Sequence, residues 1–158
     1  TNYDTSALTP VLPAGYDYHR LIGAYRTSSS HIINGDWVGT SNERTFMYDT
    51  PILDVSTASP GTNAVTPSLS TPAGIIVNAI LNIAGAIGNF GIYMSSLNSA
   101  DIAVPATYIA PLFTLMTHQG LMGFGGFVVC TNTSSQIRYR RYDNTAVYIV
   151  TLGYTMFL

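Results

Sequence analysis

The chain has 158 residues, of which 9% are charged, and its formal net charge is −2. An ordinary soluble domain has about 25% charged residues, and a weak negative charge gives no electrostatic attraction to nucleic acid, so that class of partner is not expected. The length suits one domain, and we therefore expect residues 1–158 to form a single domain. The single cysteine excludes a disulfide within the chain.

The first predicted element is a strand that the chain enters through a tight corner. Pro13 fixes its own φ and cannot donate a hydrogen bond, whereas Gly15 is free to adopt a positive φ. Residues 16–27 are rich in Tyr, Ile and Leu and show neither a helix cap nor a 3.6-residue period. We predict a strand over 16–27 that is closed by a turn or loop at 28–30.

The next part of the chain predicts several short strands, at residues 36–38, 44–48 and 52–55. Residues 49–51, which include a proline, are predicted to end the second of these strands. Residues 56–71 are rich in Ser, Thr, Pro, Gly and Asn and contain no helix signal. They predict a surface loop.

Residues 75–94 carry no charged side chain, and their length would just allow a helix to span a bilayer. Interior Asn and Gly residues and the lack of flanking Lys or Arg argue against membrane insertion. With a period of two, one face is wholly apolar and consists of Ile75, Val77, Ala79, Leu81 and Ile83. We predict a strand over 75–83, a glycine-rich turn, and a second strand from Phe90 that pairs with the first as a hairpin.

Four further strands are predicted toward the C-terminus, over residues 112–116, 126–131, 136–142 and 146–157. A loop at 98–110 precedes them, and a turn at 133–135 separates the middle two. The first two are expected to pair with each other, and the last two are expected to form a hairpin. Short strands at this spacing, joined by Ser/Thr/Gly/Pro-rich loops, indicate an all-β, antiparallel, jelly-roll-like β-sandwich.

Residues that could carry catalysis are sparse in this chain. Glu43 is the only glutamate, the seven aspartates are scattered, and the three histidines lack the spacing of a zinc site. Asp36 and Glu43 flank a turn and could hold calcium, but no known calcium-loop pattern supports this. Cys130 lies in an apolar run and is expected to be a buried small hydrophobic residue. We expect a non-enzymatic protein with no metal and no cofactor.

Arg138, Arg140 and Arg141 form the one basic cluster, and a strand would place Arg141 on the face opposite the other two. These arginines suit either a solvated or inter-subunit face, or recognition of an anionic group such as a lipopolysaccharide phosphate or an acidic sugar. Exposed aromatic residues could stack on sugar rings, the candidates being Tyr16, Tyr18, Trp37, Tyr108, Tyr139 and Tyr142. The ligand-binding candidates are therefore Trp37, Tyr108, Arg138, Arg140 and Tyr142.

Four short segments carry a resemblance to a known family. They are Leu-Pro-Ala-Gly-Tyr at 12–16, Arg-Leu-Ile-Gly-Ala-Tyr-Arg-Thr at 20–27, Gln-Ile-Arg-Tyr-Arg at 136–140 and Tyr-Ile-Val-Thr-Leu-Gly-Tyr at 148–154. The chain resembles β-sandwich domains of bacteriophage virion proteins, chiefly tail fibres. Tyr154 stands where that family usually has Trp. The matched positions Pro13, Gly15 and Gly153 are expected to be structural.

The resemblance implies a tail-fibre or spike-like module that lies on the exterior of the phage particle and is made in the cytoplasm of the bacterial host. Such a module is expected to assemble as a homo-oligomer, a trimer in the first instance, and to contact other virion proteins and a host surface glycan. The low charge also favours surfaces that are covered by neighbours. The alternative is a head-decoration or head-fibre protein with a purely structural role. Only about eleven residues precede the corner at Pro13, so we expect either an upstream segment or a sandwich that a neighbour completes.

Overall fold

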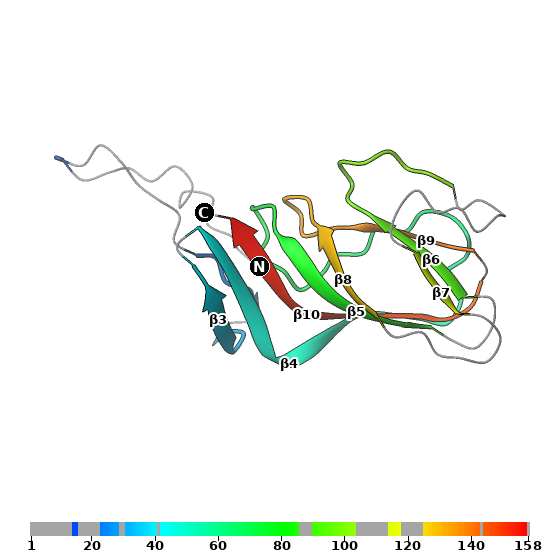
Figure 1. Ribbon diagram of the computed structural model, residues 1–158, viewed down its shortest axis with the longest axis horizontal. Coiled ribbons are helices and arrows are strands. Elements are labelled where there is room, and N and C mark those ends of the chain that lie inside the picture. Colours follow the sequence, from blue (N-terminus) through cyan, green and yellow to red (C-terminus); the bar gives the residue numbers. More distant parts are fainter. Residues whose placement is uncertain are drawn as a thin grey trace.

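The computed structural model describes residues 14–15, 23–28, 31–40, 42–85, 90–103, 114–117, 125–142 and 144–157 and shows an all-β protein (Figure 1). The strands are β1 (Thr27–Ser28), β2 (His31–Ile32), β3 (Gly35–Gly39), β4 (Glu43–Thr57), β5 (Asn78–Gly85), β6 (Phe90–Ser95), β7 (Thr114–Thr117), β8 (Gly125–Cys130), β9 (Arg138–Arg141) and β10 (Val147–Phe157). All pairings between these strands are antiparallel. The predicted fold class is confirmed. Within the described residues, no helix has the length and apolar character needed to span a bilayer.

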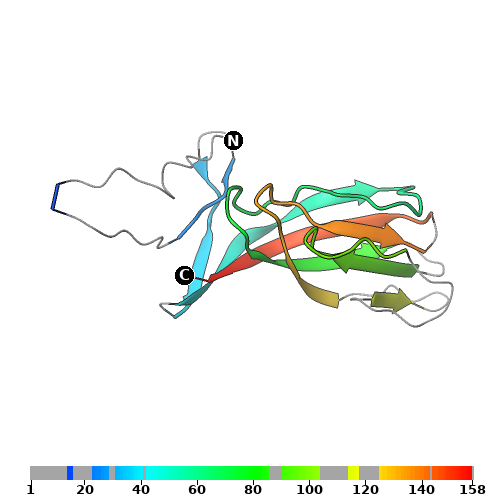
Figure 2. The same ribbon diagram turned by 90° about the horizontal axis from the view of Figure 1, so that it is seen from above.

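The strands form two facing layers (Figure 2). The larger sheet has the order β3-β4-β10-β5-β8 and the smaller has the order β7-β6-β9, while β1 and β2 pair separately. Residues 65–68 extend the smaller layer, because Val65 bridges Tyr139 of β9 and Ser68 bridges Gln136. The facing layers therefore read β4-β10-β5-β8 and (65–68)-β9-β6-β7. With the chain crossing repeatedly between layers, this is the arrangement of a jelly roll.

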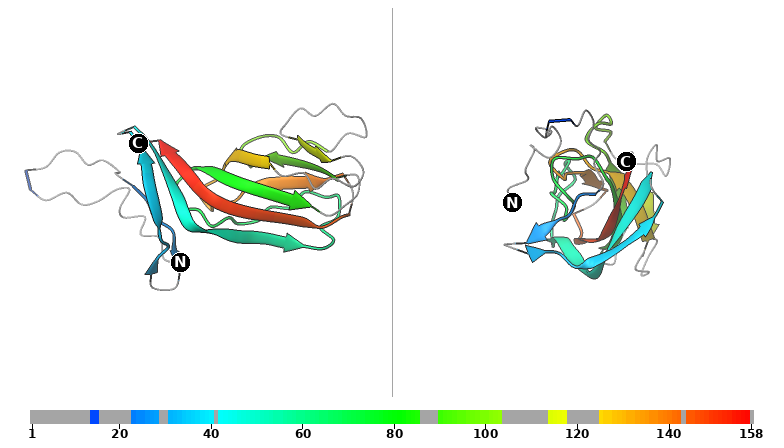
Figure 3. Two further views of the ribbon diagram at one scale, coloured as in Figure 1. Left: turned by 60° about the horizontal axis from the view of Figure 1, so that its bottom comes forward. Right: turned by 90° about the vertical axis from the view of Figure 1, so that its left-hand side faces the viewer.

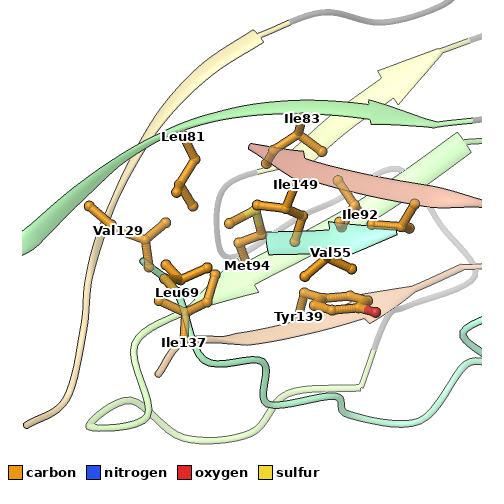
Figure 4. Close-up of a cluster of buried hydrophobic side chains, with 12 residues drawn as sticks. Val55, Leu69, Leu81, Ile83, Ile92, Met94, Val129, Ile137, Tyr139 and Ile149 are labelled. Atoms are coloured by element: carbon orange, nitrogen blue, oxygen red, sulfur yellow. The ribbon is translucent and has the colours of Figure 1, made fainter. Parts of the chain in front are cut away.

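The main hydrophobic core lies between the two layers (Figure 4). The larger sheet contributes Val55, Ala79, Leu81, Ile83, Val129, Val147 and Ile149, and the opposite side contributes Leu69, Ile92, Met94, Ile137 and Tyr139. Burying each large aliphatic side chain is worth about 1.5–3 kcal/mol, so this cluster is a major source of stability. The predicted apolar face of residues 75–83 is confirmed, since its five apolar residues are all buried.

A second core lies where β3 and the adjoining parts of β4 and β10 extend beyond the smaller sheet (Figure 3). Its buried members are Ala24, Phe46, Tyr48, Ile75, Val77, Tyr154 and Met156, with Ile33, Trp37 and Ile52 packed against them. The hydroxyl of Tyr154 donates to the carbonyl oxygen of Ala24, and so attaches the segment 23–26 to the sheet. That segment has no regular secondary structure. The predicted strand over 16–27 is therefore wrong at 23–26, and residues 16–22 lie outside the described residues.

The predicted partners of three strand pairs are wrong, although the strands themselves exist. β5 pairs with β10 and β8, whereas β6 pairs with β7 and β9, so the expected hairpin of residues 75–83 with the strand from Phe90 does not form. Likewise, β8 pairs with β5 rather than with β7, and β9 pairs with β6 rather than with β10. In each of these three pairs, the second strand lies in the opposite layer. The predicted turn at 133–135 is confirmed.

β4 is one long strand where two short ones were predicted, and it continues through Pro51. The missing N–H of Pro51 is tolerated because this part of β4 bulges: the pairing with β10 passes from Met47 directly to Ile52. A second bulge leaves Asp54 without a partner in β10, since Leu53 and Val55 pair with consecutive residues. The two bulges bend β4 between the two cores.

Residues 58–71 form an irregular segment, as predicted, but they are not purely a surface loop, and the prediction is wrong at residues 56 and 57, which belong to β4. Leu69, Ser70 and Thr71 are buried, because residues 65–68 pair with the edge of the smaller layer and direct the following residues inward. The segment that contains Leu69, Ser70 and Thr71 thus supplies core side chains as well as a connection.

Ser28, predicted to lie in a turn or loop, ends strand β1.

Candidate functional site

The arginines of β9 are divided between the two faces of the strand as predicted. Arg141 is 1% exposed, and one of its guanidinium nitrogens donates to the carbonyl oxygen of Ala146 at 3.3 Å. Arg138 and Arg140 lie on the opposite, outward face, and both reach Asp101 in the loop that follows β6.

Asp101 occupies the binding fork of Arg140. Nε and one terminal nitrogen of Arg140 donate to the two carboxylate oxygens at 2.7 and 2.6 Å. Arg138 donates to the carbonyl oxygen of Ser99 at 3.0 Å, and its Nε lies 3.7 Å from the Asp101 carboxylate. The hydrogen bond from Arg140 holds the pKa of Asp101 below its usual value. An external anion would have to displace this carboxylate, which weakens the case for Arg140 as an anion receptor.

The aromatic candidates differ in how far they are buried. Trp37 packs into the second core, with ring centroids 5.7 Å from Tyr25, 5.1 Å from Phe46 and 5.9 Å from Tyr154. Tyr139 is 1% exposed, so the expectation that it could stack on a sugar is wrong. Tyr142 is exposed. Tyr16, Tyr18 and Tyr108 lie outside the described residues.

Two of the three glycine and proline positions expected to be structural lie in the described residues, and Pro13 does not. Gly15 has a φ of +91°, the positive value that a tight corner requires. Gly153 lies where β10 crosses the bulge of β4, and a Cβ atom there would collide with the carbonyl oxygen of Phe46. Only glycine allows this close approach between the two strands.

A polar pocket that the sequence did not predict lies beside the second bulge of β4. It has a volume of about 270 Å³ and is lined by Arg26, Asp54, Ser68, Leu69, Ser70, Ala73, Ser134 and Ser135. These residues come from four separate segments of the chain. No local motif could have indicated the pocket, because its chemistry exists only once the segments meet.

Hydrogen bonds hold the wall of this pocket in place. The carboxylate of Asp54 accepts from the backbone N–H of Ser70 at 2.9 Å, from the Ser70 hydroxyl at 2.6 Å and from the Thr151 hydroxyl. The hydroxyl of Ser135 donates to the carbonyl oxygen of Thr71 at 3.0 Å. The bulge in β4 therefore aims Asp54 at the buried serine rather than at a strand partner.

A larger hollow of about 570 Å³ lies at the junction of β2, β3 and the first bulge of β4. It is lined by His31, Ile32, Ile33, Asn34, Asp49 and Thr50. Apart from Ile33 these residues are exposed, so it lacks the buried polar wall of the smaller pocket. Within the described residues, no group of three or more His, Cys, Asp or Glu residues could hold a metal ion. Cys130 is half-buried rather than buried, and its thiol donates to the carbonyl oxygen of Thr131 at 3.6 Å.

The outward side of the larger sheet carries an uncharged surface, which we call the neutral face. It consists of the outward residues of β5, β8 and β10: Asn78, Ile80, Asn82, Ala84, Gly126, Val128, Cys130, Tyr148, Val150 and Thr155. The strand register places Ile80 beside Val128 and Val150 beside Asn82. Val128 is 50% exposed and Tyr148 is 41% exposed. The exposed Asp and Glu residues of the described chain, Asp36, Glu43, Asp49 and Asp101, all lie outside β5, β8 and β10.

No family model matches this chain, and neither a curated protein nor a solved structure matches it. Jelly rolls serve many unrelated functions, so a function has to be inferred from the surfaces and pockets of this chain.

Proposed function

We propose that the chain is a non-enzymatic structural module of a bacteriophage virion, of the tail-fibre or spike kind. It assembles as a homo-oligomer on the exterior of the particle and contacts the host surface. The resemblance of the segments at 12–27 and 136–154 to phage β-sandwich domains supports this proposal, and jelly rolls are frequent among virion proteins. The sparse charge of the chain agrees with a protein whose surface is shared with neighbours.

The main observation in favour of the proposed assembly is the size and lack of charge of the neutral face. Leu53 and Ser56 of β4 are exposed and pair with Val150 and Tyr148 of β10, so they extend the neutral face over a fourth strand. Four strands spaced by about 4.8 Å and the eight residues of β5, at about 3.3 Å each, give a face of about 19 by 26 Å, or about 500 Å². Two such faces would bury about 1,000 Å² in total, which reaches the lower limit for a specific interface. A face without charge meets a second copy of itself without like-charge repulsion, and its asparagine amides can hydrogen-bond across the contact.

The symmetry follows from how the neutral face is used. If the face meets its own copy, the assembly is a two-fold dimer. If it meets a different patch of the neighbouring chain, rotation closes a ring such as the expected trimer. Sedimentation equilibrium of the purified chain gives the mass and distinguishes these two forms.

The variant Val128→Arg tests the assembly, because it places a charge on the neutral face, beside Ile80. We expect it to convert the oligomer to a folded monomer at micromolar concentration, because a buried unpaired charge costs several kcal/mol. Ile102→Arg is the matched control: Ile102 is an exposed apolar residue in the loop after β6, and its replacement should leave the oligomer intact. A wild-type chain that sediments as a stable monomer would refute the proposed assembly.

The location on the particle tests the virion assignment itself. Antibody against the chain, imaged on intact phage, should label the tail fibres or spikes. Label on the head surface would support a head-decoration protein instead. Particles without label would contradict a virion role of either kind.

A further inference from the structure

The pocket beside Asp54 is built from groups that complement a neutral, hydroxyl-rich ligand. Arg26 supplies a guanidinium donor and Asp54 a carboxylate acceptor, so the two formal charges of the lining cancel. The four serines of the lining can each donate and accept hydrogen bonds. An anion such as phosphate would lie next to the carboxylate of Asp54, which disfavours it.

Some polar side chains of this lining have no hydrogen-bond partner among the described residues. Among the residues that the structure describes, Arg26 makes no side-chain hydrogen bond and no ion pair, and the hydroxyls of Ser68 and Ser134 have no partner. Asp54 and Ser70, by contrast, are held by the bonds described above and form a rigid wall. The pocket therefore combines fixed groups with groups that still lack a partner.

The turn at the mouth of the pocket is held in a strained conformation. Ser135 has a φ of +61°, and no other non-glycine residue of the described chain has a positive φ. The side-chain oxygen of Asn132 accepts from the backbone N–H groups of Ser134 and Gln136, which holds the turn in place. Backbone strain of this kind costs about 1–3 kcal/mol and concentrates where a site must be preorganised.

We propose that this pocket binds a single neutral sugar ring, through hydrogen bonds from Arg26 and the serines and to Asp54. Its volume of about 270 Å³ is just below the range of about 300–1,000 Å³ typical of drug-sized ligands, so it suits one ring rather than an oligosaccharide. The inference rests on the proposed function only in naming a host glycan as the natural source of that ring. The pocket lining contains none of the ligand-binding candidates Trp37, Arg138, Arg140 and Tyr142 that the sequence suggested.

Saturation-transfer NMR of the full chain with the methyl α-D-pyranosides of glucose, galactose and mannose tests the proposal. We expect signal transfer to at least one of these sugars in the wild-type chain. Arg26→Gln should weaken binding at least about tenfold, because it removes charge-assisted hydrogen bonds. Ser134→Trp should abolish binding by filling the mouth of the pocket.

Matched variants separate this pocket from the rest of the surface. Arg140→Gln removes an arginine from β9, and Ser59→Trp adds an indole at an exposed serine outside the pocket lining. Because neither residue lines the pocket, both variants should bind sugar as the wild type does, and thermal unfolding should show that all four variants are folded. Loss of binding in Arg140→Gln but not in Arg26→Gln would overturn the proposal.

The choice of probe separates the chemistry of the ligand from the location of the site. Inorganic phosphate, tested by the shift of backbone amide signals of Ser134 and Ser135, should produce no saturable change. Saturable phosphate binding without any sugar binding would overturn the proposal, and so would the absence of transfer to all three sugars. Neither result would bear on oligomer formation, which the sedimentation experiments measure separately.

Discussion

At the scale of single residues, glycines and buried tyrosines make the contacts that other residue types could not make. Gly153 allows β10 to cross closely over β4. Tyr154 reaches from β10 to the carbonyl oxygen of Ala24, and Tyr48 donates to the carbonyl oxygen of Ser70. Both hydroxyls thus attach irregular segments to the larger sheet.

Replacement of Gly153 by alanine should destabilise the protein by about 2–4 kcal/mol, because the added methyl group collides with the backbone of β4. Urea unfolding gives the change in free energy. Gly126→Ala in β8 is the control, since a Cβ atom there has nothing within 4 Å. Its effect should stay within about 1 kcal/mol. Equal stability of the two variants would show that Gly153 is not required by close packing.

Replacement of Gly15 by valine should cost about 1–3 kcal/mol, because a branched residue is strained at a φ of +91°. The cost comes from the backbone alone, since an added Cβ has nothing within 4 Å. Gly15→Asn should cost less, because asparagine tolerates positive φ. Thermal unfolding measures both variants, and an unchanged melting temperature for Gly15→Val would contradict the corner.

Stability should fall steeply in alkaline solution. Burial raises the pKa of Tyr154 and of Tyr48 well above the ordinary value of 10.0. Above about pH 10 the unfolded chain loses protons that the folded chain keeps, so each tyrosine lowers the unfolding free energy by up to about 1.4 kcal/mol per pH unit. Below pH 10 this contribution to stability is fully present.

Tyr154→Phe should reduce this alkaline slope by the share of one tyrosine. At neutral pH the same variant should lose about 1 kcal/mol, because the hydrogen bond to Ala24 is absent. Urea unfolding measures both effects at several pH values between about 8 and 11.5, a range that lies on both sides of the ordinary tyrosine pKa. A variant with the wild-type slope would contradict the burial of this hydroxyl.

At the scale of the element, β4 shows how bulges serve the fold. Its first bulge accommodates Pro51, and its second turns Asp54 away from the ladder toward Ser70 and Thr151. A single carboxylate thereby connects β4, β10 and the segment that follows the 65–68 bridges. The second bulge of β4 therefore places Asp54 where it both joins these segments and lines the pocket.

Replacement of Asp54 by alanine should cost about 2–4 kcal/mol, because it leaves the N–H of Ser70 and two hydroxyls without their acceptor. Asp49→Ala is the matched control within the same strand. Asp49 is exposed, and its replacement should change the unfolding free energy by no more than about 0.5 kcal/mol. If both variants unfold at the same urea concentration, Asp54 is not the connection that its hydrogen bonds indicate.

At the scale of the whole molecule, the described residues form two hydrophobic cores and an uncharged surface. The sandwich buries aliphatic side chains between its layers, and the extension beyond the smaller sheet buries aromatic ones. The neutral face lies on the outside of the larger sheet, where it is available to another chain.

Association through the neutral face should respond to salt as a hydrophobic contact does. Sodium sulfate at 0.5 M, a condition chosen for this experiment, should tighten the oligomer, because excluded salts favour burial of apolar surface. Sodium chloride in the range that screens charges should have little effect, because the face carries no charged residue. Sedimentation at graded protein concentrations measures the dissociation constant. Dissociation on addition of sodium chloride would indicate that the contact is made by charged residues instead.

Much of the fold followed from local sequence pattern. The alternation at Ala79, Leu81 and Ile83 indicated both a strand and its buried face, because side chains of a strand point to opposite sides whatever its neighbours are. The turn at 133–135 and the outward position of Arg138 and Arg140 were also predictable from short stretches.

The pairing of the strands, the course of β4 and the pocket were decided by the tertiary structure. Adjacent strands were expected to form hairpins, but the larger sheet joins β10 to β4 and β5, which lie far away in the sequence. Pro51 could remain in a strand only because a bulge, formed with β10, removed the need for its N–H. Arg26, Asp54, Ser70 and Ser134 meet in space although no local pattern links them. A period of two is a property of the chain itself, whereas partners, bulges and pockets depend on which distant segments pack together.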